Sequence, residues 1–389
     1  MSFVECLYEG VRKTIEEYDF KYFMESCIEG FLTMGISIDR MQIPMSKVAG
    51  LRHPMYAVIV MTYEEGNVDV VFRTHQDIQA LPSSQHLKNT PYSKVLDVPN
   101  TTYRHHLDND SPFSLLQDLK KRGYREYMCA NMMLPHSSTQ LFSMATKQEQ
   151  GFCDDAEEIL RDCLIPLSLA LFATYQSNVT RSLSATYLGR QTGQKVLDGE
   201  IYRGKRESVE AGIMFCDVRG FTAMSERLGS ADVVTIMNEI FQIVEDEVVL
   251  YQGEILKFIG DALLILFPKH EESDRQIGEN MIRSALLAVQ KVEALGREKD
   301  MDLSVGFGCH IGEVLYGNIG TKNRLDFTVM GPAVNLTSRL ESMCKSLDAQ
   351  LTVSPYVAVG NEDLLTSFGK HSLKGIAEPV EIWGCPVNS

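Results

Sequence analysis

The segment Ala211–Thr222 reads Ala-Gly-Ile-Met-Phe-Cys-Asp-Val-Arg-Gly-Phe-Thr, and it decides the fold of the C-terminal half of the chain. Its first six residues are small or apolar and predict a strand over 211–216. Asp217 follows at the strand end, and Gly220 lets the backbone turn. The segment therefore predicts a carboxylate at the end of a buried strand, where active groups commonly lie.

A second carboxylate, Asp261, lies between two apolar segments, 255–259 and 263–267. Segments joined so briefly form a tight β-hairpin, with Asp261 in its turn. Two acids at neighbouring strand ends can share metal ions, because Mg²⁺ prefers carboxylate oxygens and substrate phosphates. A pair of such ions about 3.5–4 Å apart activates a hydroxyl and neutralises a leaving phosphate. Either Asp alone is equally compatible with simple turn formation.

A third group of polar residues follows Gly331-Pro332, which begins a helix well. Asn335 and Arg339 are four residues apart and project from one face near the start of that helix. Arginine at this place suits phosphate stabilisation. Taken alone, the pair is also compatible with a solvated helix face or a local cap.

Beyond Lys205 the sequence predicts one α/β domain in which strands alternate with amphipathic helices. The predicted helices are 230–250, 274–296 and 333–346, and the predicted strands are 211–216, 255–259, 263–267, 303–309 and 325–330. We expect the first two helices to cover one face of a sheet.

These residues resemble the class III adenylyl and guanylyl cyclases over about 207–385. The motifs of that family occur here in order: Phe215–Thr222, Lys257–Asp261, Thr328–Leu340 and Leu373–Gly375. The resemblance implies a ferredoxin-like catalytic domain that converts ATP to cyclic AMP and pyrophosphate. It also implies a homodimer in which metal-binding aspartates of one protomer meet the base-reading, Asn and Arg residues of the other.

The resemblance assigns each matching residue a role. Asp217, Val218 and Asp261 would hold two Mg²⁺ ions, with Mn²⁺ as a substitute. Asn335 and Arg339 would act in catalysis on the attacking ribose hydroxyl and the phosphates. The substrate-binding residues would be Lys257 and Thr328 at the base, Lys374 at the terminal phosphates, and Phe221 and Thr222.

The purine preference follows from hydrogen bonding. Adenine offers a ring-nitrogen acceptor and an amino donor, which the Lys257 ammonium and the Thr328 hydroxyl can match. Many family members carry Asp where Thr328 stands, and guanylyl cyclases usually carry Glu where Lys257 stands. The sequence is therefore similar to the threonine-bearing subclass, IIIb, and ATP is favoured over GTP.

The N-terminal part, 1–153, predicts a mixed α/β unit. A β-hairpin over 56–60 and 68–72, a helix around Leu115–Leu119, and strands over 128–134 and 140–145 are expected. This layout resembles a GAF-like sensor in front of the catalytic domain, which we place at 207–389. No set of residues specifies a ligand for it.

The connector over 154–206 contains apolar residues at four-residue spacing: Ile159, Cys163, Leu167, Leu171, Tyr175, Val179, Leu183 and Tyr187. They predict a long helical segment that Pro166 and Gly189 bend or end. The stripe fits packing on the first domain or pairing with a second chain. We favour the second chain.

Bulk properties fit a two-domain globular protein of 389 residues with 44% hydrophobic and 23% charged residues. The net charge of −15 disfavours nucleic acid as a partner. We expect no secretory leader, no membrane span and a cytoplasmic location. The nine scattered cysteines fit free thiols in a reducing compartment.

Two other functional interpretations are considered beside adenylate cyclase activity. One is a catalytically silent nucleotide-binding module that uses the cyclase fold only as a dimerising platform, and the presence of all motif residues argues against it. The other is a guanylate cyclase, which would require that Lys257 does not contact the base.

Overall fold

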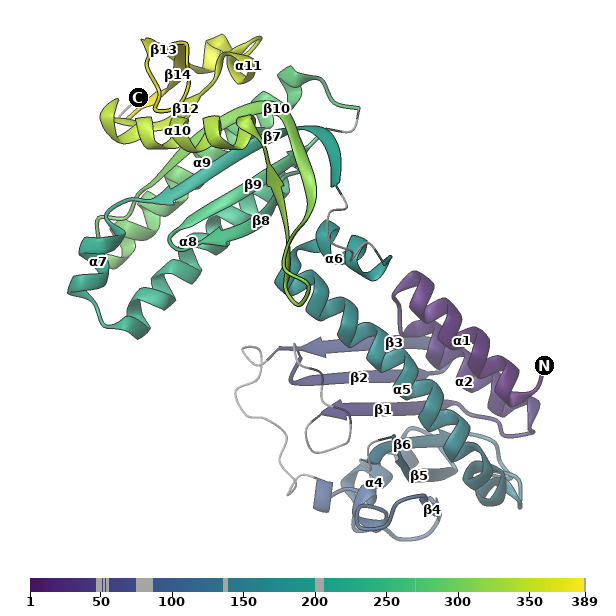
Figure 1. Cartoon of the computed structure of the whole chain (residues 1–389). Helices are drawn as coiled ribbons and strands as arrows, with labels where there is room; N and C mark the ends of the chain where they lie inside the picture. Colours follow the sequence, from purple (N-terminus) through teal and green to yellow (C-terminus); the bar gives the residue numbers. More distant parts are fainter. Residues whose placement is uncertain are drawn as a thin grey trace. The chain divides into compact units, whose positions relative to one another are not determined.

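The computed structural model describes residues 1–46, 51, 53, 56–74, 87–135, 139–199, 206–269 and 271–387. These residues form two compact units, Met1–Leu183 and Ser184–Ser389, which are described separately (Figure 1). Both units combine a large sheet with helices, so the predicted mixed α and β class is confirmed.

The first unit is built on a six-stranded antiparallel sheet in the order β3-β2-β1-β6-β5-β4. Its strands are β1 (Arg40–Ser46), β2 (Val58–Glu64), β3 (Asn67–Arg73), β4 (Thr101–His106), β5 (Glu126–Met133) and β6 (Thr139–Thr146). The predicted hairpin is β2–β3, and Glu65 and Gly66 form its turn with positive φ angles of 50° and 89°. The two later predicted strands are β5 and β6.

Helices cover both faces of this sheet. One face packs against α1 (Phe3–Glu17), α2 (Lys21–Thr33) and α5 (Ala156–Leu188). The other packs against η1 (Pro91–Lys94) and α4 (Ser114–Lys121), which is the helix predicted around Leu115–Leu119. A capping box in which Ser2 and Glu5 exchange hydrogen bonds fixes the start of α1.

The connector helix α5 packs on its own unit. Four of its predicted stripe residues are buried in the core with α1 and α2: Cys163, Leu167, Leu171 and Tyr175. The favoured pairing of these residues with a second chain is therefore wrong, because the sheet already covers them. Gly189 ends the helix with a φ of 83°, whereas α5 continues through Pro166.

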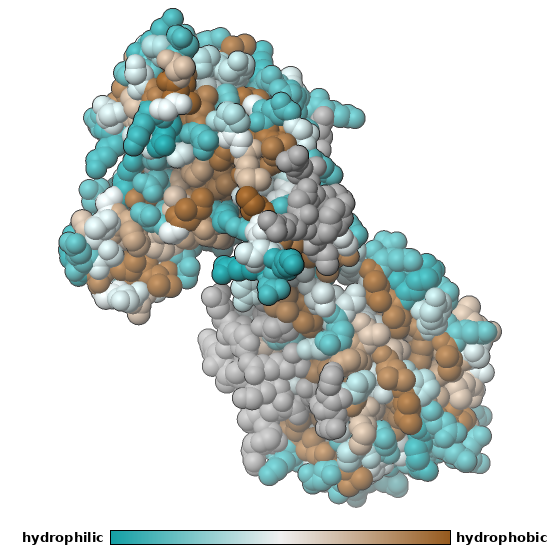
Figure 2. All heavy atoms as spheres, viewed as in Figure 1, coloured by the Kyte–Doolittle hydropathy of each residue, from teal (hydrophilic) through white to brown (hydrophobic). Residues whose placement is uncertain are grey.

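A different side of α5 is exposed. Ile165 and Leu169 are 62% and 53% exposed, and on α1 Val4 and Tyr8 are 60% and 67% exposed. Figure 2 shows hydrophobic side chains gathered over the helices of this unit. These exposed residues belong to a different stripe from the one that the sequence singled out.

The second unit contains an eight-stranded sheet in the order β13-β14-β12-β10-β7-β9-β8, with β11 paired to β10. Its strands are β7 (Arg206–Val218), β8 (Glu254–Ile259), β9 (Ala262–Pro268), β10 (Val305–Gly320), β11 (Leu325–Met330), β12 (Ala349–Val353), β13 (Thr366–His371) and β14 (Val380–Pro386). The four strands β7 to β10, with their two crossover helices, have the spatial order 4-1-3-2 of a ferredoxin-like fold.

The helices of this unit are α6 (Arg190–Leu197), α7 (Phe221–Arg227), α8 (Ser230–Leu250), α9 (Asp274–Lys299), α10 (Pro332–Ser346), α11 (Pro355–Ala358) and η2 (Glu362–Leu364). As predicted, α8 and α9 share one face of the sheet, where they bury Met214 and Cys216 of β7. Ile213, next to Met214 on the strand, packs instead with Ala333 of α10. Helix α10 therefore packs on the opposite face.

Most elements of this unit lie where the sequence placed them, but β10 is longer than predicted. The sequence predicts a strand over 303–309, whereas β10 runs to Gly320 and pairs with β11 along its second half. The expectation failed because Gly312 and Gly317 interrupt the apolar pattern of that half. Helix α7 and strands β12 to β14 were not predicted.

None of the described helices is both long enough and apolar enough to cross a lipid bilayer. All nine cysteines are free, and eight of them are buried.

Candidate active site

The structure brings Asp217 and Asp261 together at one end of the sheet. Asp217 is the next-to-last residue of β7 and pairs with Ala262 of β9. Asp261 lies in the β8–β9 turn, where Gly260 has a φ of 66° that favours glycine. The backbone N–H of Val218 donates to the carbonyl oxygen of Asp261 at 3.3 Å. This bond fixes the turn beside the strand end.

The negative charges of Asp217 and Asp261 repel each other. Burial raises the pKa of Asp217, and the charge of Asp261 raises it further, while Arg219 acts in the opposite direction. A divalent cation would bind both carboxylates as ligands and would remove the repulsion between them. Within the described ranges no cluster of three or more Asp, Glu, His or Cys side chains forms a metal site. An ion here would complete its shell with water and phosphate oxygens, as Mg²⁺ commonly does.

Phe221 and Thr222 occupy the first turn of α7, directly after the carboxylate strand. Gly220 precedes them with a φ of 69°, so the chain turns sharply from β7 into the helix. Phe221 is partly buried against the core shared with α8, whereas Thr222 is exposed. The turn places both residues within a few positions of Asp217.

Lys257 lies on β8 and forms an ion pair with Asp326 of β11. Thr328 follows two residues later on the same strand, so it lies on the same side as Asp326. The neighbouring Phe327 and Val329 point the other way and are buried. The structure thus pairs Lys257 with Asp326, a residue that the sequence did not single out, on the side of β11 where Thr328 also lies.

Asn335 and Arg339 are exposed on one face of α10. In the described part of the chain, no ion pair or side-chain hydrogen bond connects them to Asp217 or Asp261. Lys374 is exposed in the turn after β13, next to Gly375, whose φ is 82°. Within the described residues, no direct polar contact therefore joins Asn335 and Arg339 to the carboxylate pair.

Arg219 and Glu341 form a second feature that the sequence did not reveal. The guanidinium Nη2 lies 3.1 Å from the carboxylate Oε1. Burial raises the pKa of Glu341 to about 7, Arg219 opposes this rise, and the charge of Asp217 adds to it. The sequence signal that could have indicated this pair is Glu341 itself, an acidic residue two positions after Arg339 on an amphipathic helix.

The whole constellation lies within one recognisable segment. Residues 204–383 match the family model of the adenylate and guanylate cyclase catalytic domain. That segment contains every residue of this section. The match agrees with the resemblance that the sequence motifs indicated.

Two curated proteins that are similar to this chain are named as adenylate cyclases. The chain is 28% identical over 208 residues to "Adenylate cyclase 1" of Rhizobium meliloti (strain 1021), covering 51% of this chain and 31% of that protein. It is 31% identical over 194 residues to "Adenylate cyclase" of Anabaena cylindrica, covering 46% and 37%. The chain thus spans about a third of the length of these relatives.

Among solved structures, this chain is similar to the adenylyl cyclase CyaB from P. aeruginosa. The identity is 25%, the TM-score is 0.44, and the match covers 48% of this chain and 97% of the other.

Proposed function

We propose that this protein is an adenylate cyclase that converts ATP to 3′,5′-cyclic AMP and pyrophosphate. The observation that carries the proposal is the carboxylate pair of Asp217 and Asp261 at one sheet end, inside a segment that matches the cyclase family. The named relatives over this segment are adenylate cyclases.

The carboxylates would hold the metal ions. Asp217 and Asp261, with the Val218 main chain between them, suit two Mg²⁺ or Mn²⁺ ions. When bound, such ions lower the pKa of a coordinated hydroxyl and neutralise the charge of a leaving phosphate. The protein supplies a fixed strand end and a fixed turn, so the two carboxylates need no rearrangement to converge on substrate oxygens.

The remaining residues would orient the nucleotide. Asn335 positions the ribose so that its 3′-oxygen faces the α-phosphate, and Arg339 donates to the oxygens on which charge develops. Lys374 binds the terminal phosphates as a point charge. Phe221 and Thr222 line the entry from α7.

A complete site would need two copies of the chain. Within the described residues of one chain, no direct polar contact joins the carboxylates to Asn335 and Arg339 of α10, which agrees with a site shared across a homodimer. The exposed apolar residues of α1 and α5, such as Val4 and Ile165, give a second copy further surface to cover. A monomer would be inactive.

Lys257 and Thr328 favour ATP over GTP. The ammonium donates to the ring nitrogen of adenine, and the hydroxyl oxygen accepts from its amino group. The same two residues support the threonine-bearing IIIb subclass. Guanylate cyclase activity is the second candidate, because the matched family contains both activities.

The first unit would act as a GAF-like sensor over 1–153, joined by a connector over 154–206 to a catalytic domain over 207–389. Its six-stranded sheet with helices on both faces suits this role. The signal would be an unidentified ligand. We expect the protein to work in the cytoplasm.

The test is cyclic nucleotide production by the purified full chain, with ATP or GTP and with Mg²⁺ or Mn²⁺. Cyclic AMP formed by the parent and lost in Asp217→Ala supports the proposal. A parent that is dimeric, binds ATP and cyclises neither nucleotide would favour the silent-module reading. Cyclic GMP as the main product would favour the guanylate cyclase.

A further inference from the structure

The ion pair between Arg219 and Glu341 connects the strand that carries Asp217 to the helix that carries Asn335 and Arg339. The Arg219 and Glu341 side chains are only 25% and 13% exposed. Both paired atoms, Nη2 and Oε1, are removed from solvent and make no conventional hydrogen bond within the described residues. Each charge therefore depends on the other for stabilisation.

Arg219 is fixed on the strand side of this pair. Its backbone N–H donates to the carbonyl oxygen of Ser304 at 2.9 Å. Gly306 pairs with Asp217 in the sheet, and a Cβ at Gly306 would overlap the guanidinium. The guanidinium thus fills the space that this glycine leaves, directly beside the carboxylate strand.

Glu341 is fixed on the helix side. A Cβ at Gly308 would overlap the backbone of α10 at Glu341, so the helix lies in close contact with β10. Hydrogen bonds hold α10 there: Thr352 Oγ1 donates to Leu340 O at 2.6 Å, and Cys344 Sγ donates to Phe307 O at 3.2 Å. The helix cannot shift at Glu341 without also moving Arg339 and Asn335, which lie two and six residues earlier on α10.

We propose that Arg219 and Glu341 are positioning residues that couple the two active sites of a dimer. The inference rests on the proposed function, in which the carboxylates of one chain meet α10 of its partner. Each chain then gives its carboxylate pair to one site and its α10 to the other. The ion pair connects these two contributions inside the chain, so a displacement at one site reaches the other.

A mixed dimer with a single complete site tests whether the ion pair acts both in the chain that donates Asp217 and in the chain that donates Arg339. One full-length chain carries Asp217→Ala and the other carries Arg339→Ala, and two affinity tags isolate the mixed species. Its complete site uses Asp217 of the second chain and Arg339 of the first. Glu341→Gln, which keeps the side-chain shape and removes the charge, is then added to either chain in turn.

We expect the kcat of the complete site to fall about tenfold whichever chain carries Glu341→Gln, because one charge-assisted interaction is lost on either side. The KM for ATP should stay within about twofold, since neither residue touches the nucleotide. A fall confined to either one of the two chains, or no fall, would overturn the inference alone. A parent mixed dimer without activity would instead refute the shared site of the proposed function.

Metal binding gives a readout that is independent of turnover. Without Glu341, the Arg219 charge stands uncompensated beside the carboxylates and should weaken Mn²⁺ binding about threefold in the full chain without nucleotide. Electron paramagnetic resonance measures this, and an unchanged affinity would contradict the link. Arg219→Lys keeps the charge and should retain most activity. Arg219→Met should lower kcat as Glu341→Gln does, but it should not weaken Mn²⁺ binding, because it removes the positive charge beside the carboxylates.

The matched control is Arg283→Gln, which breaks an exposed ion pair with Glu279 on α9. It should change neither kcat nor Mn²⁺ affinity. Unfolding midpoints of all variants separate a positioning role from a loss of folded protein.

Discussion

The ammonium of Lys257 on β8 is paired with the carboxylate of Asp326 on β11 within a single chain. The two side chains are 35% and 50% exposed, so the pair contributes little to folding. In the proposed enzyme, the same ammonium reads the purine base. Asp326 therefore competes with the nucleotide for Lys257.

Asp326→Asn should release Lys257 and tighten ATP binding. Because exposed pairs are worth at most about 1 kcal/mol, the KM for ATP should fall by no more than about fivefold, and the unfolding free energy should change by less than about 1 kcal/mol. Steady-state kinetics with ATP and GTP measure the effect. A higher KM for ATP would show that Asp326 holds Lys257 in its reading position instead.

Arg339→Ala should separate catalysis from stability. The side chain is exposed on α10, so the unfolding free energy should change by about 0.5 kcal/mol or less. If Arg339 stabilises charge on the phosphates, kcat should fall about 100-fold to 1,000-fold. Lys345→Ala, on an exposed position of the same helix, serves as the control and should leave kcat unchanged. Equal activities of the two variants would contradict the role of Arg339.

Gly308→Ala should displace α10 from β10. The added Cβ would overlap the helix backbone at Glu341, and overpacking of this kind costs about 1–3 kcal/mol. We expect a lower unfolding midpoint together with a reduced kcat, because the same helix carries Asn335 and Arg339. Gly229→Ala is the control, since its Cβ would meet nothing closer than 3.6 Å, and it should cost less than about 1 kcal/mol. A normal midpoint for Gly308→Ala would disprove this close packing.

Local sequence signals predicted the parts of the site that lie on single elements. The Gly260-Asp261 turn between two apolar segments predicted the hairpin, and Gly331-Pro332 predicted the start of α10. The ion pairs of Lys257 and Arg219 escaped prediction because their partners lie far along the chain, on elements that only tertiary packing brings together. For Lys257 the separation is 69 residues. Hydrophobic periodicity predicts on which side of a helix or strand a residue lies, but it does not predict which residue of another element will contact it.

The connector helix α5 is a second case in which sequence periodicity did not predict a tertiary contact. The four-residue spacing correctly indicated an apolar stripe on α5, but it did not reveal which surface covers that stripe. A sheet face of the first unit buries Leu167 and Leu171. The choice between a neighbouring sheet and a second chain depends on tertiary packing, which the spacing does not encode.

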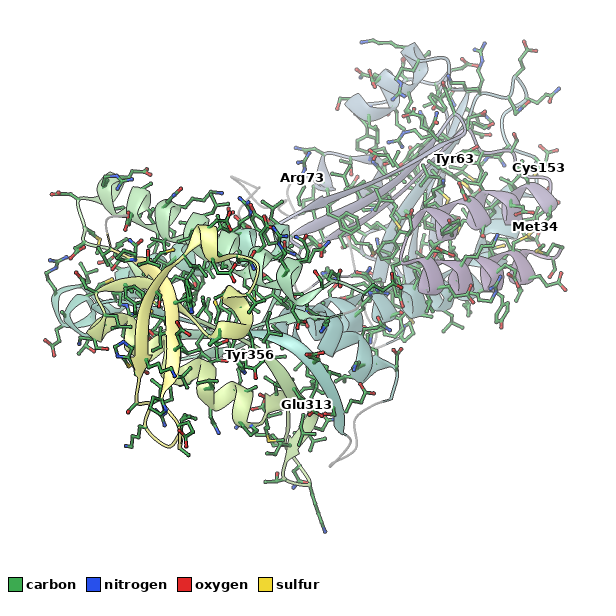
Figure 3. All side chains as sticks on the ribbon, turned by 90° about the horizontal axis from the view of Figure 1, so that it is seen from above. Met34, Tyr63, Arg73, Cys153, Glu313 and Tyr356 are labelled. Carbon is green, nitrogen blue, oxygen red and sulfur yellow. The ribbon has the colours of Figure 1, made fainter. Side chains whose placement is uncertain are left out.

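His310 should make the stability of the second unit depend on pH. Its Nδ1 lies 2.8 Å from the hydroxyl of Ser354, and its ring packs edge-on against Tyr356 with centroids 5.5 Å apart. His310 also lines a cavity of about 390 Å³ with Glu313 and Tyr356, both labelled in Figure 3. Burial lowers the pKa of His310 to about 4 from the ordinary 6.5, although carboxylates such as Glu313 line the same cavity.

The direction of this pH dependence follows from proton uptake by the unfolded chain. Above pH 6.5 the imidazole is neutral in both the folded and unfolded chains, and its contribution to stability is fully present. As the pH falls from 6.5 towards 4, the unfolded chain binds a proton that the folded chain excludes, so up to about 3 kcal/mol of stability is lost. His310→Gln keeps a hydrogen-bonding group for Ser354 but does not titrate, so it should lose less stability over this range. Urea unfolding of both proteins at pH 7 and pH 4.5 makes the comparison, and equal losses would mean that folded His310 takes up the proton as readily as the unfolded chain does.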